Sequence, residues 1–67
     1  MSSKFFLGDI VSFKNGKNVI EGQVIDLEWL DDSRIFVYTI QDKNLSEYRV
    51  GQSGVKMVPF NKRINKW

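Results

Sequence analysis

Cysteine and histidine are both absent from the 67 residues of this chain. Their absence removes thiol chemistry, disulfides, the usual zinc ligands and the familiar Ser–His and Cys–His catalytic pairs. Nor does any apolar run approach the roughly 18 residues that a membrane-spanning helix needs. The sequence therefore predicts a cytoplasmic protein with no catalytic residue, no metal, no cofactor and no membrane partner.

Carboxylates could still support acid–base or metal chemistry, and two pairs lie close together: Asp31 with Asp32, and Asp26 with Glu28. Acid–base catalysis needs carboxylates that share a cleft and differ in pKa. A single strand also supplies too few oxygen ligands for a calcium cage. We interpret both pairs as solvated surface charge.

Charge is distributed unevenly along the chain. Residues 19–47 contain seven acids against Arg34 and Lys43, whereas residues 48–67 contain five bases and no acid. Such segregation predicts one acidic and one basic face on a folded domain. It favours a partner of negative or mixed charge.

The apolar spacing in the first half is typical of strands. Val11 and Phe13 alternate with Ile10 and Ser12, so one pair is expected to face the core. Asn15-Gly16 then predicts a tight hairpin, because both residues tolerate positive φ. A second strand is expected over residues 19–29. Its apolar phase changes after Val24, close to Gly22, which predicts a bulge or sharp bend.

Three further strands are expected, over residues 34–41, 47–50 and 55–58, separated by turns rich in Asp, Asn and Gly. Pro59 ends the last strand. Five short strands in one small chain predict an all-β, five-stranded barrel. We divide the chain into an N-terminal segment (1–7), the barrel (8–60) and a basic tail (61–67), whose start is expected to form a helical turn.

Gly8-Asp9-Ile10-Val11, Gly22-Gln23-Val24-Ile25 and the closing Val55-Lys56-Met57-Val58-Pro59 resemble the motifs of SH3-like small barrels. Among these, the chain is similar to the Tudor and KOW kinds, which often open with Gly-Asp-x-Val and carry Gly-x-Val on the next strand. The resemblance implies an SH3-like barrel that serves as a binding module. KOW-like barrels commonly contact RNA or ribosomal and transcription partners.

The chain also shares features with the plasmid-encoded type II dihydrofolate reductases, which are tetrameric SH3-like barrels. The shared features are Gly22-Gln23, Pro59 and Arg63-Ile64-Asn65. That resemblance implies a reductase, but the reactive Val-Gln-Ile-Tyr stretch of the family corresponds to Val55-Lys56-Met57-Val58 here. Because the glutamine and tyrosine that position both ligands are missing, we expect no enzymatic activity.

Nucleic-acid association is the first functional expectation. Lys and Arg neutralise phosphates and release counterions, so they give an affinity that depends on salt. The candidate RNA or DNA contacts flank the first turn, lie on late strands or belong to the tail: Lys14, Lys17, Arg49, Lys56, Lys62, Arg63 and Lys66. The competing interpretation is a solubilising surface with a basic tail.

A protein–protein module is the alternative expectation. Tudor-type barrels hold methylated Lys or Arg in an aromatic cage by cation–π attraction, and the resemblance makes Trp29, Tyr38 and Tyr48 the candidate residues. The competing interpretation is that these rings pack in the core or at its edge. Self-association through Phe5-Phe6-Leu7, through the end that carries Phe60 and Trp67, or through an unpaired strand edge is a further expectation.

Overall fold

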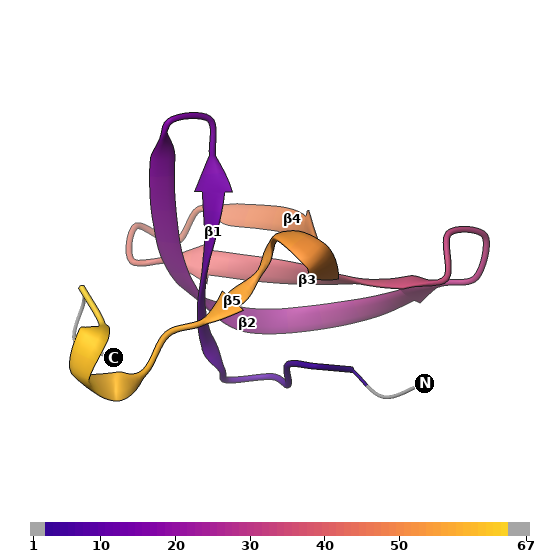
Figure 1. Ribbon diagram of the computed structural model, residues 1–67, viewed down its shortest axis with the longest axis horizontal. Helices are drawn as coiled ribbons and strands as arrows, with labels where there is room; N and C mark the ends of the chain where they lie inside the picture. The colour runs from indigo at the N-terminus through magenta and orange to yellow at the C-terminus, as the bar shows by residue number, and fades with distance from the viewer. Residues whose placement is uncertain (1–2, 65–67) are drawn as a thin grey trace.

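The computed structural model describes residues 3–64 and consists mainly of strands (Figure 1). Two short 3₁₀ turns, η1 (Gln52–Gly54) and η2 (Phe60–Lys62), follow the fourth and fifth strands. The strands are β1 (Ile10–Asn15), β2 (Asn18–Leu30), β3 (Ile35–Asp42), β4 (Glu47–Gly51) and β5 (Lys56–Met57). The predictions of an all-β domain, five strands and a helical turn at the start of the tail are confirmed.

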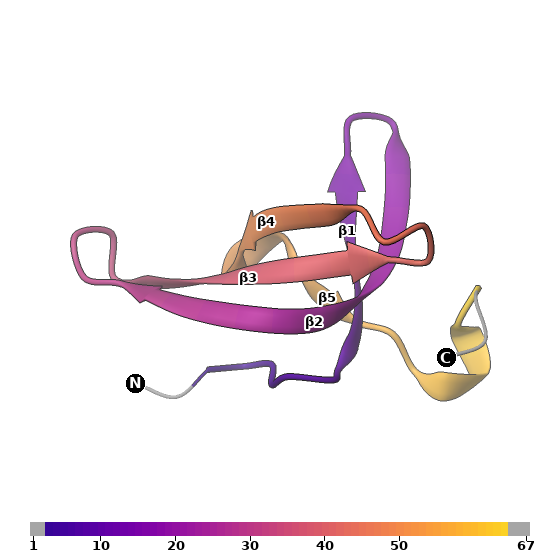
Figure 2. The ribbon, with the colours of Figure 1, turned by 180° about the vertical axis from the view of Figure 1, so that it is seen from behind.

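All five strands belong to one antiparallel sheet in the order β4-β3-β2-β1-β5. The sheet folds over itself, so that β1, β5 and the first half of β2 face the layer formed by the second half of β2 with β3 and β4 (Figures 1 and 2). Within residues 3–64 no strand pairing joins β4 to β5. The hydrogen-bonded ladder of the predicted five-stranded barrel therefore stays open between these two edges.

Strand β2 bends because its register shifts between Val24 and Asp26. Val24 points into the core, Ile25 is exposed, and Leu27 packs against the core again. The predicted change of phase is thus a β-bulge, which lets one long strand pair with β1 over its first half and with β3 over its second. At Gly22 the backbones of β2 and β3 approach closely, since a Cβ there would lie 2.6 Å from the Gln41 carbonyl oxygen.

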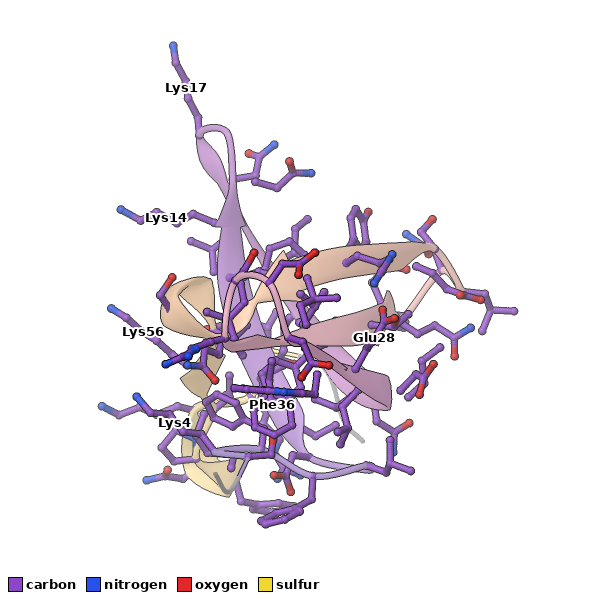
Figure 3. The ribbon with its side chains drawn as sticks, turned by 90° about the vertical axis from the view of Figure 1, so that its right-hand side faces the viewer. Lys4, Lys14, Lys17, Glu28, Phe36 and Lys56 are labelled. Atoms are coloured by element: carbon purple, nitrogen blue, oxygen red, sulfur yellow. The ribbon has the colours of Figure 1, made fainter. Side chains whose placement is uncertain are left out.

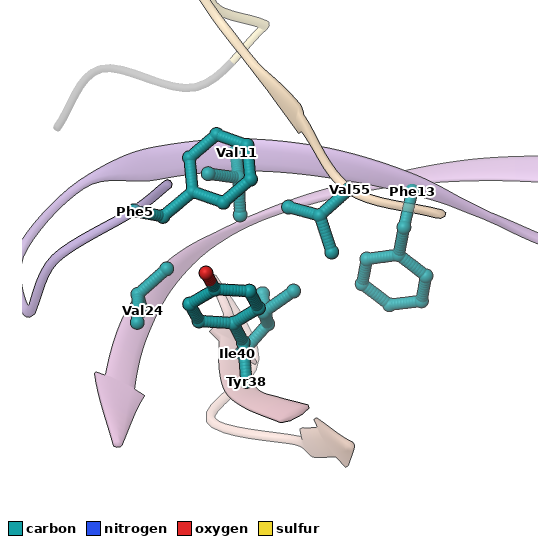
Figure 4. Packing of buried hydrophobic residues seen from close by; sticks show 7 residues of the cluster. All are labelled: Phe5, Val11, Phe13, Val24, Tyr38, Ile40 and Val55. Atoms are coloured by element: carbon teal, nitrogen blue, oxygen red, sulfur yellow. The ribbon is translucent and has the colours of Figure 1, made fainter. Parts of the chain in front are cut away.

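The main core fills the space between the two layers (Figure 4). Tyr38 is fully buried at its centre, its hydroxyl group lies 2.6 Å from Ser3 Oγ, and its ring meets Phe5 edge-on. The N-terminal segment therefore covers one end of the core, although Phe6 and Leu7 are exposed. The members of this core are Phe5, Val11, Phe13, Val24, Tyr38, Ile40 and Val55.

The segment after β5 lies along β1 and β2. The Val58 amide donates to the Ile10 carbonyl oxygen (3.0 Å), and the Ile64 amide donates to Glu21 Oε2 (2.8 Å). Ile10, Val58 and Glu21 are all buried, but none belongs to the main core. The C-terminal segment thus covers part of the sheet face opposite the core. No helix in residues 3–64 has the length and apolar character to cross a membrane.

Tyr48 gives a pH-dependent test of the β3–β4 turn. Its hydroxyl group donates to Asp42 Oδ2 (3.1 Å), and this hydrogen bond, together with partial desolvation and the negative charge of Asp42, raises the pKa of Tyr48 above its ordinary 10.0. Because the folded-state pKa is raised, the stabilising contribution is complete below pH 10 and is lost as the pH rises through the folded pKa. In a Tyr38→Phe background, absorbance titration should show a phenol pKa above 10, and Asp42→Asn should lower it. An unchanged pKa in Asp42→Asn would contradict this assignment.

Candidate functional site

The outward positions of β1 carry the candidate site. Ser12 pairs with Lys56 of β5 on one side and Glu21 of β2 on the other, and Lys14 pairs with Val19 of β2. Directly paired residues of an antiparallel sheet point to the same face, and so do residues two apart on a strand. Strand register therefore places Lys14 and Lys56 on one face of the molecule.

A groove of about 470 Å³ opens between the β1–β2 hairpin and the connection from β4 to β5. It lies at the edge where the hydrogen-bonded ladder is open, so its two walls come from distant parts of the chain. Among the described residues that line it, two are lysines and none is acidic. We call it the hairpin groove, and its lining residues are Ser12, Phe13, Lys14, Val19, Val50, Ser53, Gly54 and Lys56.

A second hollow of about 270 Å³ adjoins the hairpin groove and shares Ser12, Val19 and Lys56 with it. It extends toward the C-terminal segment and adds Lys62. The Glu21 carboxylate also lines it, but Glu21 is only 6% exposed and accepts the hydrogen bond from Ile64. The exposed charged side chains that border this hollow are therefore those of Lys56 and Lys62.

Figure 3 shows Lys4, Lys14, Lys17 and Lys56 on one side of the molecule, with Glu28 lying away from them. Lys17 lies in the β1–β2 turn and is exposed, as are the other three lysines. We define the basic face by the lysines that border the two hollows or the hairpin tip: Lys14, Lys17, Lys56 and Lys62. The sequence predicted all four, but not that Lys4 lies on their side.

Of the other predicted basic contacts, Arg49 and Arg63 line neither hollow. Arg49 of β4 forms an ion pair with Glu28 of β2, and both side chains are more than half exposed. The Arg63 guanidinium carbon lies 5.1 Å from the centre of the Phe60 ring, and Arg63 Nε is buried without a hydrogen-bond partner among residues 3–64. Lys66 lies outside the described residues.

The three candidate aromatic residues each pack on a different ring. Trp29 packs on Phe36 with tilted rings whose centres lie 4.9 Å apart, Tyr38 meets Phe5, and Tyr48 packs on Phe13. Tyr38 has no exposed surface, so a ligand has no access to it in this fold. Trp29 is 37% exposed, and its indole N–H donates to Asp31 Oδ1 (2.6 Å). The contacts therefore favour packing over an aromatic cage built from these three residues.

Acidic side chains do not assemble a metal site in the part of the chain that the structure describes. The apolar and small residues of the hairpin groove, Val19, Val50, Ser53 and Gly54, were not predicted as site residues. No short motif marks them, because they meet only when β4 and η1 fold toward the hairpin. Comparison of the chain with protein-family models, with curated proteins and with solved structures gave no match.

Proposed function

We propose that this protein is a small non-enzymatic module that binds nucleic acid through the basic face. The observation that carries the proposal is the alignment of exposed lysines on one side of the molecule, away from Glu28 (Figure 3). These lysines form a local concentration of positive charge, although the chain as a whole carries a net charge of only +2. A localised positive surface attracts the phosphate backbone and steers its approach.

We further propose that the bent sheet is an SH3-like barrel whose open seam forms the hairpin groove. Two findings support this: the antiparallel order β4-β3-β2-β1-β5 and the bulge that lets β2 serve both layers. Val50 of β4 and Lys56 of β5 both line the groove, so the two edges of the sheet lie on either side of it. By its motifs the chain resembles the Tudor-like and KOW-like modules.

Salt dependence tests the proposal. Four phosphate contacts by the basic face give an expected slope of log affinity against log salt of about −3 for a single strand. We expect dissociation constants of roughly 1–100 µM at physiological salt, as for binding without sequence preference, and tighter binding at low salt. Fluorescence anisotropy with labelled RNA and DNA oligonucleotides over a series of salt concentrations measures both quantities. Absence of binding at low salt would overturn the proposed function.

A protein partner is the second candidate, and two adjacent apolar side chains favour it. Phe6 is 63% exposed and Leu7 is 62% exposed, next to the buried Phe5. Burial of apolar surface in a protein interface depends little on salt, in contrast to phosphate binding. A pull-down with and without nuclease distinguishes the two candidates, because only a nucleic-acid-dependent complex is lost on nuclease treatment.

A further inference from the structure

The walls of the hairpin groove combine apolar and basic side chains in a defined arrangement. Val19 comes from the hairpin and Val50 from the end of β4, and the largely buried Phe13 also lines the groove. Lys14 and Lys56 border the same space. An occupant that matches these walls has a flat or apolar body and carries negative charge beside it.

We infer that the hairpin groove holds one unpaired nucleobase while Lys14 and Lys56 bind the flanking phosphates. The inference rests on the proposed function and deepens it, since it names single-stranded nucleic acid as the ligand. Its volume of about 470 Å³ falls in the range of small-ligand pockets. Bases that leave the stack are commonly held between aromatic or apolar side chains.

A duplex presents no unpaired base to the hairpin groove. A paired base is stacked on both faces and presents only its edges, so its apolar faces are not available to Val19 and Val50. A duplex can still approach the lysines through its phosphates. The groove therefore predicts that an unpaired base adds to the affinity of a single strand. A duplex lacks this contribution and binds through its charge alone.

A larger side chain at position 54 can fill the groove without straining the backbone. Its φ does not lie in the positive range, and a Cβ there would lie 3.6 Å from Val50 Cγ1, which is ordinary contact. Gly54→Leu thus adds an apolar side chain beside a groove wall and leaves all lysines in place. Ser33→Leu is the matched control, because Ser33 is exposed in the turn between β2 and β3.

The test compares a short oligothymidylate with an abasic deoxyribose-phosphate strand of the same length, which has the same charge and no base. We expect the natural strand to bind about tenfold more tightly than the abasic strand, as expected for the loss of one stacked base. Gly54→Leu should remove most of this difference without changing the salt slope, and Ser33→Leu should retain it. The affinity for a duplex of equal length should be the same in Gly54→Leu as in the unaltered protein, because a duplex binds through its phosphates alone.

The possible failures are distinguishable. Equal, salt-dependent binding of both strands, or an unchanged difference in Gly54→Leu, overturns the base site and leaves the proposed function intact. Absence of binding by either strand at low salt overturns both. Should Gly54→Leu fail to fold, Val19→Ser replaces it, since Val19 is 57% exposed and lies outside the core. Val19→Ser should also reduce the difference between the strands, and an unchanged difference overturns the base site.

Discussion

The triple variant Lys14→Gln, Lys17→Gln, Lys56→Gln should lose roughly 100-fold in affinity for single-stranded oligonucleotides at low salt. Each lysine that contacts a phosphate contributes about 0.7 to the slope of log affinity against log salt, so the slope should become shallower by about 2. The loss should shrink as salt rises, because the same counterion release drives both effects. Anisotropy titrations over a salt series measure the affinity and the slope together.

A charge-matched control separates location from net charge. Arg34→Gln, Lys43→Gln, Arg49→Gln also removes three cations, but none of these residues lines either hollow. Arg49 already pairs with Glu28, and exposed pairs of this kind contribute at most about 1 kcal/mol to stability. The control should lose much less affinity than the basic-face variant. Equal losses in the two triple variants would contradict a localised binding face.

Gly22→Ala should destabilise the domain by about 2–3 kcal/mol, which is a large part of the roughly 3–10 kcal/mol expected for a chain of this size. The added Cβ would lie 2.6 Å from both the Gln41 carbonyl oxygen and Ile40 Cγ2. The backbone oxygen has no rotamer to change, so β2 and β3 must separate where they pair. Thermal unfolding followed by circular dichroism should show a midpoint lowered by roughly 10–20 °C.

Gly51→Ala is the matched control for this prediction. Gly51 has extended backbone angles (φ −68°, ψ 151°), and a Cβ there would lie 3.6 Å from Ile35 Cδ1. Its midpoint should be unchanged or slightly raised, because alanine restricts the unfolded chain. If Gly22→Ala unfolds at the same temperature as Gly51→Ala, the close approach of β2 and β3 is not as described.

Local chemistry explains why the strands could be predicted. Asn15-Gly16 marks the first hairpin, where Gly16 has a φ of 65°, and the β-branched run of β3 is typical of a buried strand. The bend in β2 was visible as a change of apolar phase, since side chains alternate along a strand. These signals arise from residues that are neighbours in sequence.

The site could be predicted only in part, because it depends on contacts between distant residues. Basic residue type alone did not distinguish Arg49, which pairs with Glu28 across the sheet, from Lys56, which borders the groove. Aromatic type likewise did not distinguish the buried Tyr38 from the partly exposed Trp29. The groove itself comes from the approach of the β4–β5 connection to the hairpin, which no local pattern encodes.

Amide chemical shifts of the isotope-labelled protein, measured as a single-stranded oligonucleotide is added at low salt, test the central claim most directly. Binding at the basic face predicts that the largest changes fall in the β1–β2 hairpin, at Ser53 and Gly54, and at Lys56. The turn between β2 and β3, where Trp29 and Asp31 interact, should change little. Changes centred on that turn, or none at all, would contradict the account.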